Sequence, residues 1–218
     1  MPKFETALFD FDGTIADTLP LIYAAFDAAI TPSLGRRLSN REVRALFGPP
    51  DHDIIRLLVQ NEHQEMAIAT YVDFYAREHH RLASAFVDMD TLLRQCRAHG
   101  IKVGVVTGKS RITAEISLQE MGISDAYDVL VAGDDIEQSK PHPEGILTAL
   151  DALGKTNRAP AVYIGDSAAD VLAGRAAGIK AIAVTWGSPD HEELRAAQPD
   201  VTCDTVAELA DALGVDWN

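Results

Sequence analysis

Two aspartates near the start of the chain have the spacing of a paired carboxylate site. Asp10 and Asp12 directly follow the apolar run 7–9 and precede Gly13. Residues two apart on an extended segment point the same way, so both carboxylates are expected to face one pocket. Burying two like charges together is unfavourable unless a cation offsets them. The pair therefore predicts a metal site, and Gly13 permits the tight turn that such a site needs.

A pair of aspartates separated by one residue is weak evidence alone, because the pattern recurs at 51–53 and at 88–90. Asp51 follows Gly-Pro-Pro, and Asp90 precedes an apolar stretch of helical character. Both are predicted to lie at helix N-termini, where a carboxylate accepts free backbone amides. Only Asp10 and Asp12 close a predicted buried strand.

A second apolar strand ends in another group of carboxylates, within the segment Gly165-Asp166-Ser167-Ala168-Ala169-Asp170. Asp166 is a candidate oxygen ligand for a hard cation such as Mg²⁺. The alternative role for Asp166 is a helix N-cap. Asp170 is equally compatible with a simple charge in the first helical turn and with a supporting role behind the metal ligands.

Two further strand-to-helix loops offer groups that suit an anion. Thr107 and Gly108 follow an apolar strand and supply a hydroxyl and a backbone amide. Lys140 precedes Pro141 in a loop before a later helix, where its ammonium can balance phosphate and carboxylate charge. A lone lysine is most often a surface residue, so the interpretation depends on all four segments meeting at one edge.

Apolar runs alternate with amphipathic stretches along most of the chain, which predicts an α/β fold with a doubly wound parallel sheet. The expected strands cover 7–9, 103–106, 161–164 and 181–184, with weaker strands at 129–131 and 201–202. The expected helices cover 111–121, 144–153 and 168–177. Gly122, Gly154 and Gly178 follow these helices as C-terminal stops.

The segment from Leu19 to Ser84 breaks this alternation, because it contains only helical patterns separated by turn residues. We expect a helical domain over 17–84, inserted into an α/β core formed by 1–16 and 85–218. Ser39-Asn40-Arg41-Glu42 is a capping-box sequence. A longer helix is predicted over 62–82, with an apolar stripe at helical spacing formed by Met66, Ala69, Val72 and Tyr75.

The bulk properties exclude several classes of protein. The formal net charge of -14 argues against nucleic-acid binding and against an anionic membrane surface. Cys96 and Cys203 form no zinc or disulfide pattern, which favours a reduced, cytoplasmic setting. No run approaches the ~18 apolar residues of a membrane span, and the first residues lack the apolar segment of a signal peptide.

Taken in order, these segments resemble the four motifs of the haloacid dehalogenase-like hydrolase superfamily: Asp10 to Thr14, Thr107-Gly108, Lys140-Pro141, and Gly165-Asp166-Ser167 with Asp170. The stretches 177–179, 184–187 and 193–194 look like its phosphoglycolate phosphatase branch, and the helical insertion resembles that branch's cap domain. Two departures are visible. The segment 86–89 stands where many relatives have a Pro-Gly turn, and Gly108 stands where Asn or Ser is commoner.

The resemblance implies a Mg²⁺-dependent phosphatase that forms an aspartyl-phosphate on Asp10. Asp12 would protonate the leaving oxygen and later activate water. Thr107, Gly108 and Lys140 would hold phosphoryl oxygens or balance their charge. The implied metal ligands are Asp10, the backbone carbonyl of Asp12, and Asp166.

Residue types argue against other activities of the same superfamily. Dehalogenases lack the second aspartate of the first motif, whereas Asp12 is present. Phosphonate-cleaving members use a cap lysine, and the segment 19–84 contains no lysine. Sugar-phosphate mutases carry a cap histidine where this chain has Ile22.

The substrate is expected to be a small phosphorylated metabolite, with phosphoglycolate leading and pyrophosphate, sugar phosphates and nucleoside monophosphates left open. A phosphoacceptor signalling domain and a catalytically silent binding module are the non-enzyme alternatives. The expected assembly is a monomer or a homodimer. Candidate contacts to the leaving group are Gly48, Pro49 and the nearby arginines Arg36, Arg37, Arg41, Arg44 and Arg56.

Overall fold

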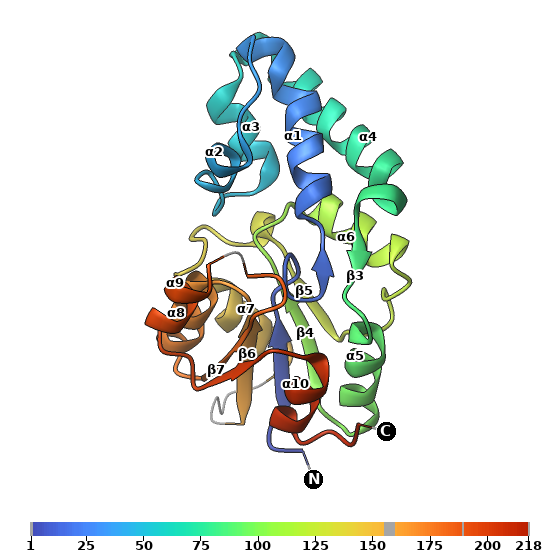
Figure 1. Ribbon diagram of the computed structural model, residues 1–218, viewed down its shortest axis with the longest axis vertical. Coiled ribbons are helices and arrows are strands. Elements are labelled where there is room, and N and C mark those ends of the chain that lie inside the picture. Colours follow the sequence, from blue (N-terminus) through green and yellow to red (C-terminus); the bar gives the residue numbers. More distant parts are fainter. Residues whose placement is uncertain (1, 155–159, 189, 218) are drawn as a thin grey trace.

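A six-stranded, wholly parallel sheet forms the centre of the core in a computed structural model that describes residues 2–154, 160–188 and 190–217 (Figure 1). This confirms the predicted α/β class and all six expected strands. Across the sheet the strands are β5 (Val129–Val131), β4 (Lys102–Val106), β1 (Thr6–Phe9), β6 (Ala161–Gly165), β7 (Lys180–Val184) and β8 (Val201–Cys203).

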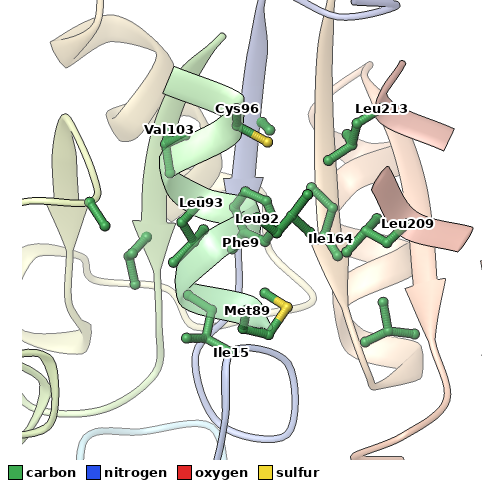
Figure 2. Close-up of a cluster of buried hydrophobic side chains, with 14 of the residues drawn as sticks. Phe9, Ile15, Met89, Leu92, Leu93, Cys96, Val103, Ile164, Leu209 and Leu213 are labelled. Atoms are coloured by element: carbon green, nitrogen blue, oxygen red, sulfur yellow. The ribbon is translucent and has the colours of Figure 1, made fainter. Parts of the chain in front are cut away.

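Helices cover both faces of the sheet, because successive residues of each central strand point to opposite sides. Phe9 belongs to one buried cluster with Leu92 and Leu209, which Figure 2 labels, whereas its neighbour Leu8 belongs to a separate buried cluster with Ile146 and Ala173. The core helices are α5 (Met89–Ala98), α6 (Arg111–Glu120), α7 (Glu144–Ala152), α8 (Ala168–Ala176), α9 (His191–Ala196) and α10 (Val206–Leu213), with a short 3-10 helix η2 (Gly133–Asp135).

Strand register brings the predicted site residues to one edge of the sheet. Phe9 of β1 lies opposite Val105 of β4 and Ile164 of β6. The residues that follow these three strands therefore leave the sheet at the same carboxyl edge. The chain continues from β1 toward β4 and β5, and later returns on the other side of β1 with β6, β7 and β8. This reversal beside β1 is the usual place for a ligand crevice in an open parallel sheet.

A helical unit, here called the cap (residues 19–82), projects above this edge (Figure 1). A short antiparallel ribbon of β2 (Ala16–Asp17) and β3 (Ser84–Ala85) carries the chain into and out of the cap. The cap has its own buried cluster around Phe26, Tyr71 and Tyr75. Its helices are α1 (Leu19–Leu34), α2 (Asn40–Arg44), α3 (Asp51–Leu58), η1 (Asn61–His63) and α4 (Gln64–Leu82).

The predicted capping box at Ser39 is present, but the predicted stripe of α4 is only half right, because Tyr75 and Val72 pack in the cap cluster whereas Met66 and Ala69 are exposed. Met66 is 73% exposed, and the residues buried on α4 are Ala67, Tyr71, Tyr75 and His79. The expected stripe used a spacing of three, which drifts around a helix of 3.6 residues per turn. The buried residues recur every four positions, a spacing that stays closer to one side of the helix than a spacing of three does.

Asp51 joins the cap to the core. It begins α3, as predicted, but its Oδ2 atom accepts hydrogen bonds from the Ser110 amide (3.2 Å), the Ser110 hydroxyl (2.9 Å) and the Thr113 hydroxyl (2.7 Å). The carboxylate therefore stabilises the N-terminus of core helix α6, and the prediction that it would accept amides of its own helix is wrong. A buried anion is favourable there because the helix dipole is positive at that end.

No helix within the described ranges is long and apolar enough to cross a membrane.

Asp88 adopts the left-handed region, with a φ of 68°, immediately before α5. Glycine takes this conformation without the steric cost that Asp88 bears. We expect Asp88→Gly to raise the free energy of unfolding by about 1 kcal/mol, and the melting temperature by roughly 2–4 °C. Urea and thermal unfolding measure both. Asp90→Gly is the control, because Asp90 lies inside the helix, where glycine lowers stability. Stabilisation by both substitutions, or by neither, would contradict the argument.

Candidate active site

A cavity of about 420 Å³ lies between the carboxyl edge of the sheet and the cap. From the core it is lined by Asp10, Asp12, Gly108, Lys109, Lys140 and Asp166, and from the cap by Ile22, Phe26, Arg44, Phe47, Gly48 and Tyr71, among others. The structure thus brings five predicted site residues, Asp10, Asp12, Gly108, Lys140 and Asp166, to one cavity.

Lys140 links two of the carboxylates. Its Nζ lies 2.9 Å from Asp10 Oδ1, 2.6 Å from Asp170 Oδ1 and 3.2 Å from the Tyr163 hydroxyl. Burial lowers the pKa of this lysine, but the Asp10 and Asp170 carboxylates outweigh burial and leave its pKa well above the ordinary value. Lys140 is therefore a fixed cation at the strand ends rather than a surface lysine.

Asp10, Asp166 and Asp170 form a tight acidic cluster, each offering a carboxylate oxygen within 4.8 Å of the others. Burial raises the pKa of Asp10 to about 7, although the Lys140 ammonium opposes the rise. Burial raises the pKa of Asp166 well above its ordinary value, and the carboxylates of Asp170 and Asp10 add to this rise. Three hard oxygen donors that share one compensating lysine suit a divalent cation such as Mg²⁺.

Gly13 is required where the chain turns beside this cluster. Its φ of 79° is left-handed, and a Cβ atom placed on it would collide with the Asp166 carboxylate. Any larger residue would push apart the segments that carry Asp10 and Asp166.

Asp170 lies in the first turn of α8, as one of its two predicted roles requires, and the supporting role behind metal ligands stays a prediction. Its carboxylate accepts a hydrogen bond from the Ser167 amide at 3.0 Å and completes a capping box at the start of α8. Its other oxygen pairs with Lys140. Ser167, rather than Asp166, is the N-cap of α8, so the Asp166 carboxylate remains part of the acidic cluster.

Asp12 lies in different surroundings from Asp10. Its Oδ1 atom accepts hydrogen bonds from the Thr18 hydroxyl and from Lys109 Nζ, the latter at 3.1 Å. The Asp12 carboxylate is outside the acidic cluster, which is consistent with the expectation that Asp12 offers a metal only its backbone carbonyl. The two aspartates of the first motif thus have separate cationic partners.

Lys109 was not predicted as a site residue. Its side chain is 4% exposed, and its Nζ lies 4.6 Å from the centre of the Tyr75 ring of α4. Burial lowers the pKa of Lys109, but the Asp12 carboxylate reverses the effect and leaves the pKa above its ordinary value. The available sequence signal was its place directly after Thr107-Gly108, at the same strand end.

Thr107 and Gly108 differ in their access to the cavity. Gly108 lines it, whereas Thr107 is buried and its hydroxyl accepts a hydrogen bond from the Lys109 amide at 3.3 Å. Thr107 therefore shapes the loop that presents Gly108 and Lys109. Its contact with a phosphoryl oxygen stays a prediction.

Comparison with known proteins agrees with this arrangement. Residues 7–184 match the model of a family described as haloacid dehalogenase-like hydrolase. A protein named pyrophosphatase PpaX from Bacillus cereus is 33% identical over 207 residues, covering 95% of both chains. The protein of the same name from Bacillus mycoides is 31% identical over an equal length and share.

Solved structures share the fold. A predicted phosphoglycolate phosphatase from Haemophilus somnus superposes with a TM-score of 0.84 at 20% identity, covering 97% of this chain and 99% of that one. CbbY from Rhodobacter sphaeroides, solved with phosphate, gives a TM-score of 0.83 at 23% identity, covering 97% and 100%. With the carboxylates, the lysine and the inserted cap in their expected order, the chain belongs to the haloacid dehalogenase-like hydrolase family.

Proposed function

We propose that this protein is a Mg²⁺-dependent phosphatase that hydrolyses a small phosphorylated metabolite through an aspartyl-phosphate on Asp10. One observation carries the proposal. The Asp10 carboxylate reaches a cavity of substrate size while Lys140, Asp166 and Asp170 surround it. The family match supports hydrolysis, and the geometry supports Asp10 as the nucleophile.

In the first step an Asp10 carboxylate oxygen forms a bond to phosphorus as the bond from phosphorus to the leaving oxygen breaks. Asp12 donates a proton to that oxygen, so the leaving group departs neutral at this atom. In the second step water attacks the phosphoaspartate, Asp12 accepts the proton of the water, and phosphate is released. The bond from phosphorus to the Asp10 oxygen breaks in this second step, which regenerates the Asp10 carboxylate.

Neighbouring side chains prepare the two aspartates for these different roles. Lys140 holds the Asp10 carboxylate at 2.9 Å and remains available to balance phosphoryl charge. Lys109 and the Thr18 hydroxyl hold Asp12 away from the acidic cluster. The proton donor is thus kept beside the nucleophile without joining its charge cluster.

The proposed ligands for Mg²⁺ are Asp10, Asp166 and the Asp12 backbone carbonyl, with Asp170 supporting them through Lys140. When bound, the ion would neutralise phosphoryl charge and allow an anionic nucleophile to approach. Without a divalent ion the clustered carboxylates repel each other and retain protons, as the raised pKa values of Asp10 and Asp166 indicate.

Two substrates lead. The resemblance noted in the sequence favours phosphoglycolate, whereas the names of the relatives that are 31–33% identical favour pyrophosphate. The cavity volume of about 420 Å³ suits either molecule. We further propose that the cap opens and closes over the site, excluding water while the phosphoaspartate forms. The Asp51 contact to α6 would then be one that opening breaks.

We expect Asp10→Asn to abolish burst phosphorylation and to lower turnover at least 1,000-fold, about 4 kcal/mol in the barrier, because the nucleophile is lost. Asp12→Asn is expected to slow both formation of the phosphoenzyme, because the proton donor is lost, and its hydrolysis, because water is no longer activated. Quenched-flow measurements with ³²P-labelled substrate and Mg²⁺ separate the two steps. Wild-type turnover in Asp10→Asn would eliminate the proposed mechanism.

Mg²⁺ is expected to raise the melting temperature more at pH 8 than at pH 6. Asp10 has a pKa of about 7 in the folded apo protein, against an ordinary value of 3.8. The folded state therefore keeps this proton up to a higher pH than the unfolded chain does. As a result, the contribution of the Asp10 carboxyl to the stability of the apo protein falls as pH rises from 3.8 to about 7. The ion binds the ionised form, so its affinity rises over the approach to pH 7.

Differential scanning fluorimetry with and without Mg²⁺ measures this effect. Asp166→Asn should remove most of the Mg²⁺ shift. Glu193→Gln should retain the shift, because Glu193 lines the cavity outside the acidic cluster. A shift that is independent of pH and unaffected by Asp166→Asn would place the ion elsewhere.

A further inference from the structure

Arg44 is a cation on the cap wall of the active-site cavity. It is the last residue of α2, a short helix that begins with the Ser39 capping box and buries Val43 in the cap. Arg44 is half-buried and lines the cavity with Phe47 and Gly48. The Tyr23 ring stacks on Phe47, and Arg44 is near enough to oppose part of the rise in the pKa of Tyr23 that burial causes.

The other four arginines that were candidates for contact with the leaving group either form ion pairs elsewhere or lie outside the cavity lining. Arg36 pairs with Glu42 at 3.0 Å, Arg37 with Asp27 at 3.2 Å, and Arg56 with Asp53 at 3.1 Å. Arg41 is exposed on α2 and is not part of the cavity lining. Of the five candidates, only Arg44 reaches the cavity.

Arg44 is also the lining cation that is left without an anionic partner. Lys140 is paired with Asp10 and Asp170, and Lys109 with Asp12. Over the described parts of the chain, Arg44 has neither a salt bridge nor a side-chain hydrogen bond. A half-buried guanidinium presents a planar set of donors that matches a carboxylate or a phosphoryl group.

The charge around the cavity shows why such a cation matters. Asp51, Asp190 and Glu193 line it in addition to the aspartates at the strand ends. A substrate with a second negative group would meet repulsion from these carboxylates. Among the described residues that the cap contributes to the cavity lining, Arg44 is the one that carries a positive charge.

We propose that Arg44 forms a subsite for a second anionic group, a carboxylate or a phosphoryl group, at the end of the substrate remote from the reacting phosphorus. This inference rests on the proposed function of the same cavity and narrows its substrate class. The enzyme selects small phosphate compounds whose leaving group carries its own negative charge, over compounds of the same size whose leaving group is neutral.

The test compares phosphate compounds whose leaving group carries this second negative charge with compounds whose leaving group is neutral, and follows how the ratio changes between protein variants. Phosphoglycolate is paired with 2-hydroxyethyl phosphate, which replaces the carboxylate with an alcohol, and pyrophosphate is paired with methyl phosphate. We expect Arg44→Gln to lower the ratio of kcat/KM for the charged over the neutral member by ~10- to 100-fold, the size of a charge-assisted interaction. Arg44→Lys should restore part of the ratio. Arg41→Gln, a loss of the same charge on the same helix, should leave it unchanged.

The two substrate pairs also identify the anion. A fall confined to the first pair assigns the subsite to a carboxylate, and a fall confined to the second assigns it to a phosphoryl group. Turnover of the neutral members and a wild-type melting temperature show that the variant is folded.

An unchanged ratio in Arg44→Gln, or an equal fall after Arg41→Gln, would overturn the subsite while the phosphatase assignment stands. Failure of the wild-type protein to hydrolyse any of the four compounds with Mg²⁺ would instead refute the proposed function. The two failures are therefore distinguishable in one set of assays.

Discussion

Repulsion among carboxylates at the carboxyl edge of the sheet is the interaction on which this site depends. Asp10, Asp166 and Asp170 place oxygens within 4.8 Å of each other, and Lys140 forms ion pairs with two of them, Asp10 and Asp170. Burial therefore raises the pKa of Asp10 to about 7. Bringing these carboxylates together lowers the stability of the fold. The arrangement persists because the adjacent strands β1 and β6 and the capping box of α8 hold the groups in place. The same unfavourable charge is what makes the cluster suitable for a divalent cation.

The neighbouring aspartate is kept out of this cluster by its own partners. Asp12 is hydrogen-bonded by Lys109 and Thr18, and Lys109 lies over the ring of Tyr75. The Tyr75 hydroxyl is 2.8 Å from the hydroxyl of Ser117 on α6. Because Tyr75 belongs to the cap and Ser117 to the core, the surroundings of Asp12 include both units. The Asp12 carboxylate is thus sensitive to how the cap rests on the core, whereas the acidic cluster is built from the core alone.

Core and cap divide the cavity between chemistry and selection. The core contributes the residues at the strand ends, whose positions follow from the register of buried strands. The cap contributes Arg44 and apolar side chains, and Asp51 connects it to the N-terminus of α6. Under the proposed function, substitutions in the cap would therefore change the preferred leaving group without moving Asp10. This division explains why the reaction type is easier to infer than the substrate.

The sequence alone determined the α/β class, the six strands and the order of the four motifs, because buried parallel strands leave continuous apolar runs and their ends are marked by polar residues. It also predicted the capping box at Ser39, which depends on four adjacent residues. The buried face of α4, the contact of Asp51 with α6 and the burial of Lys109 were decided only by the tertiary structure. Each of these features depends on contacts between residues that are distant in sequence. Local spacing does not show which surface packs against a helix or which carboxylate pairs with a lysine. Arg44 shows the same limit. The sequence could not distinguish the five candidate arginines of the cap, and only the packing of the cap on the core brings one of them to the cavity.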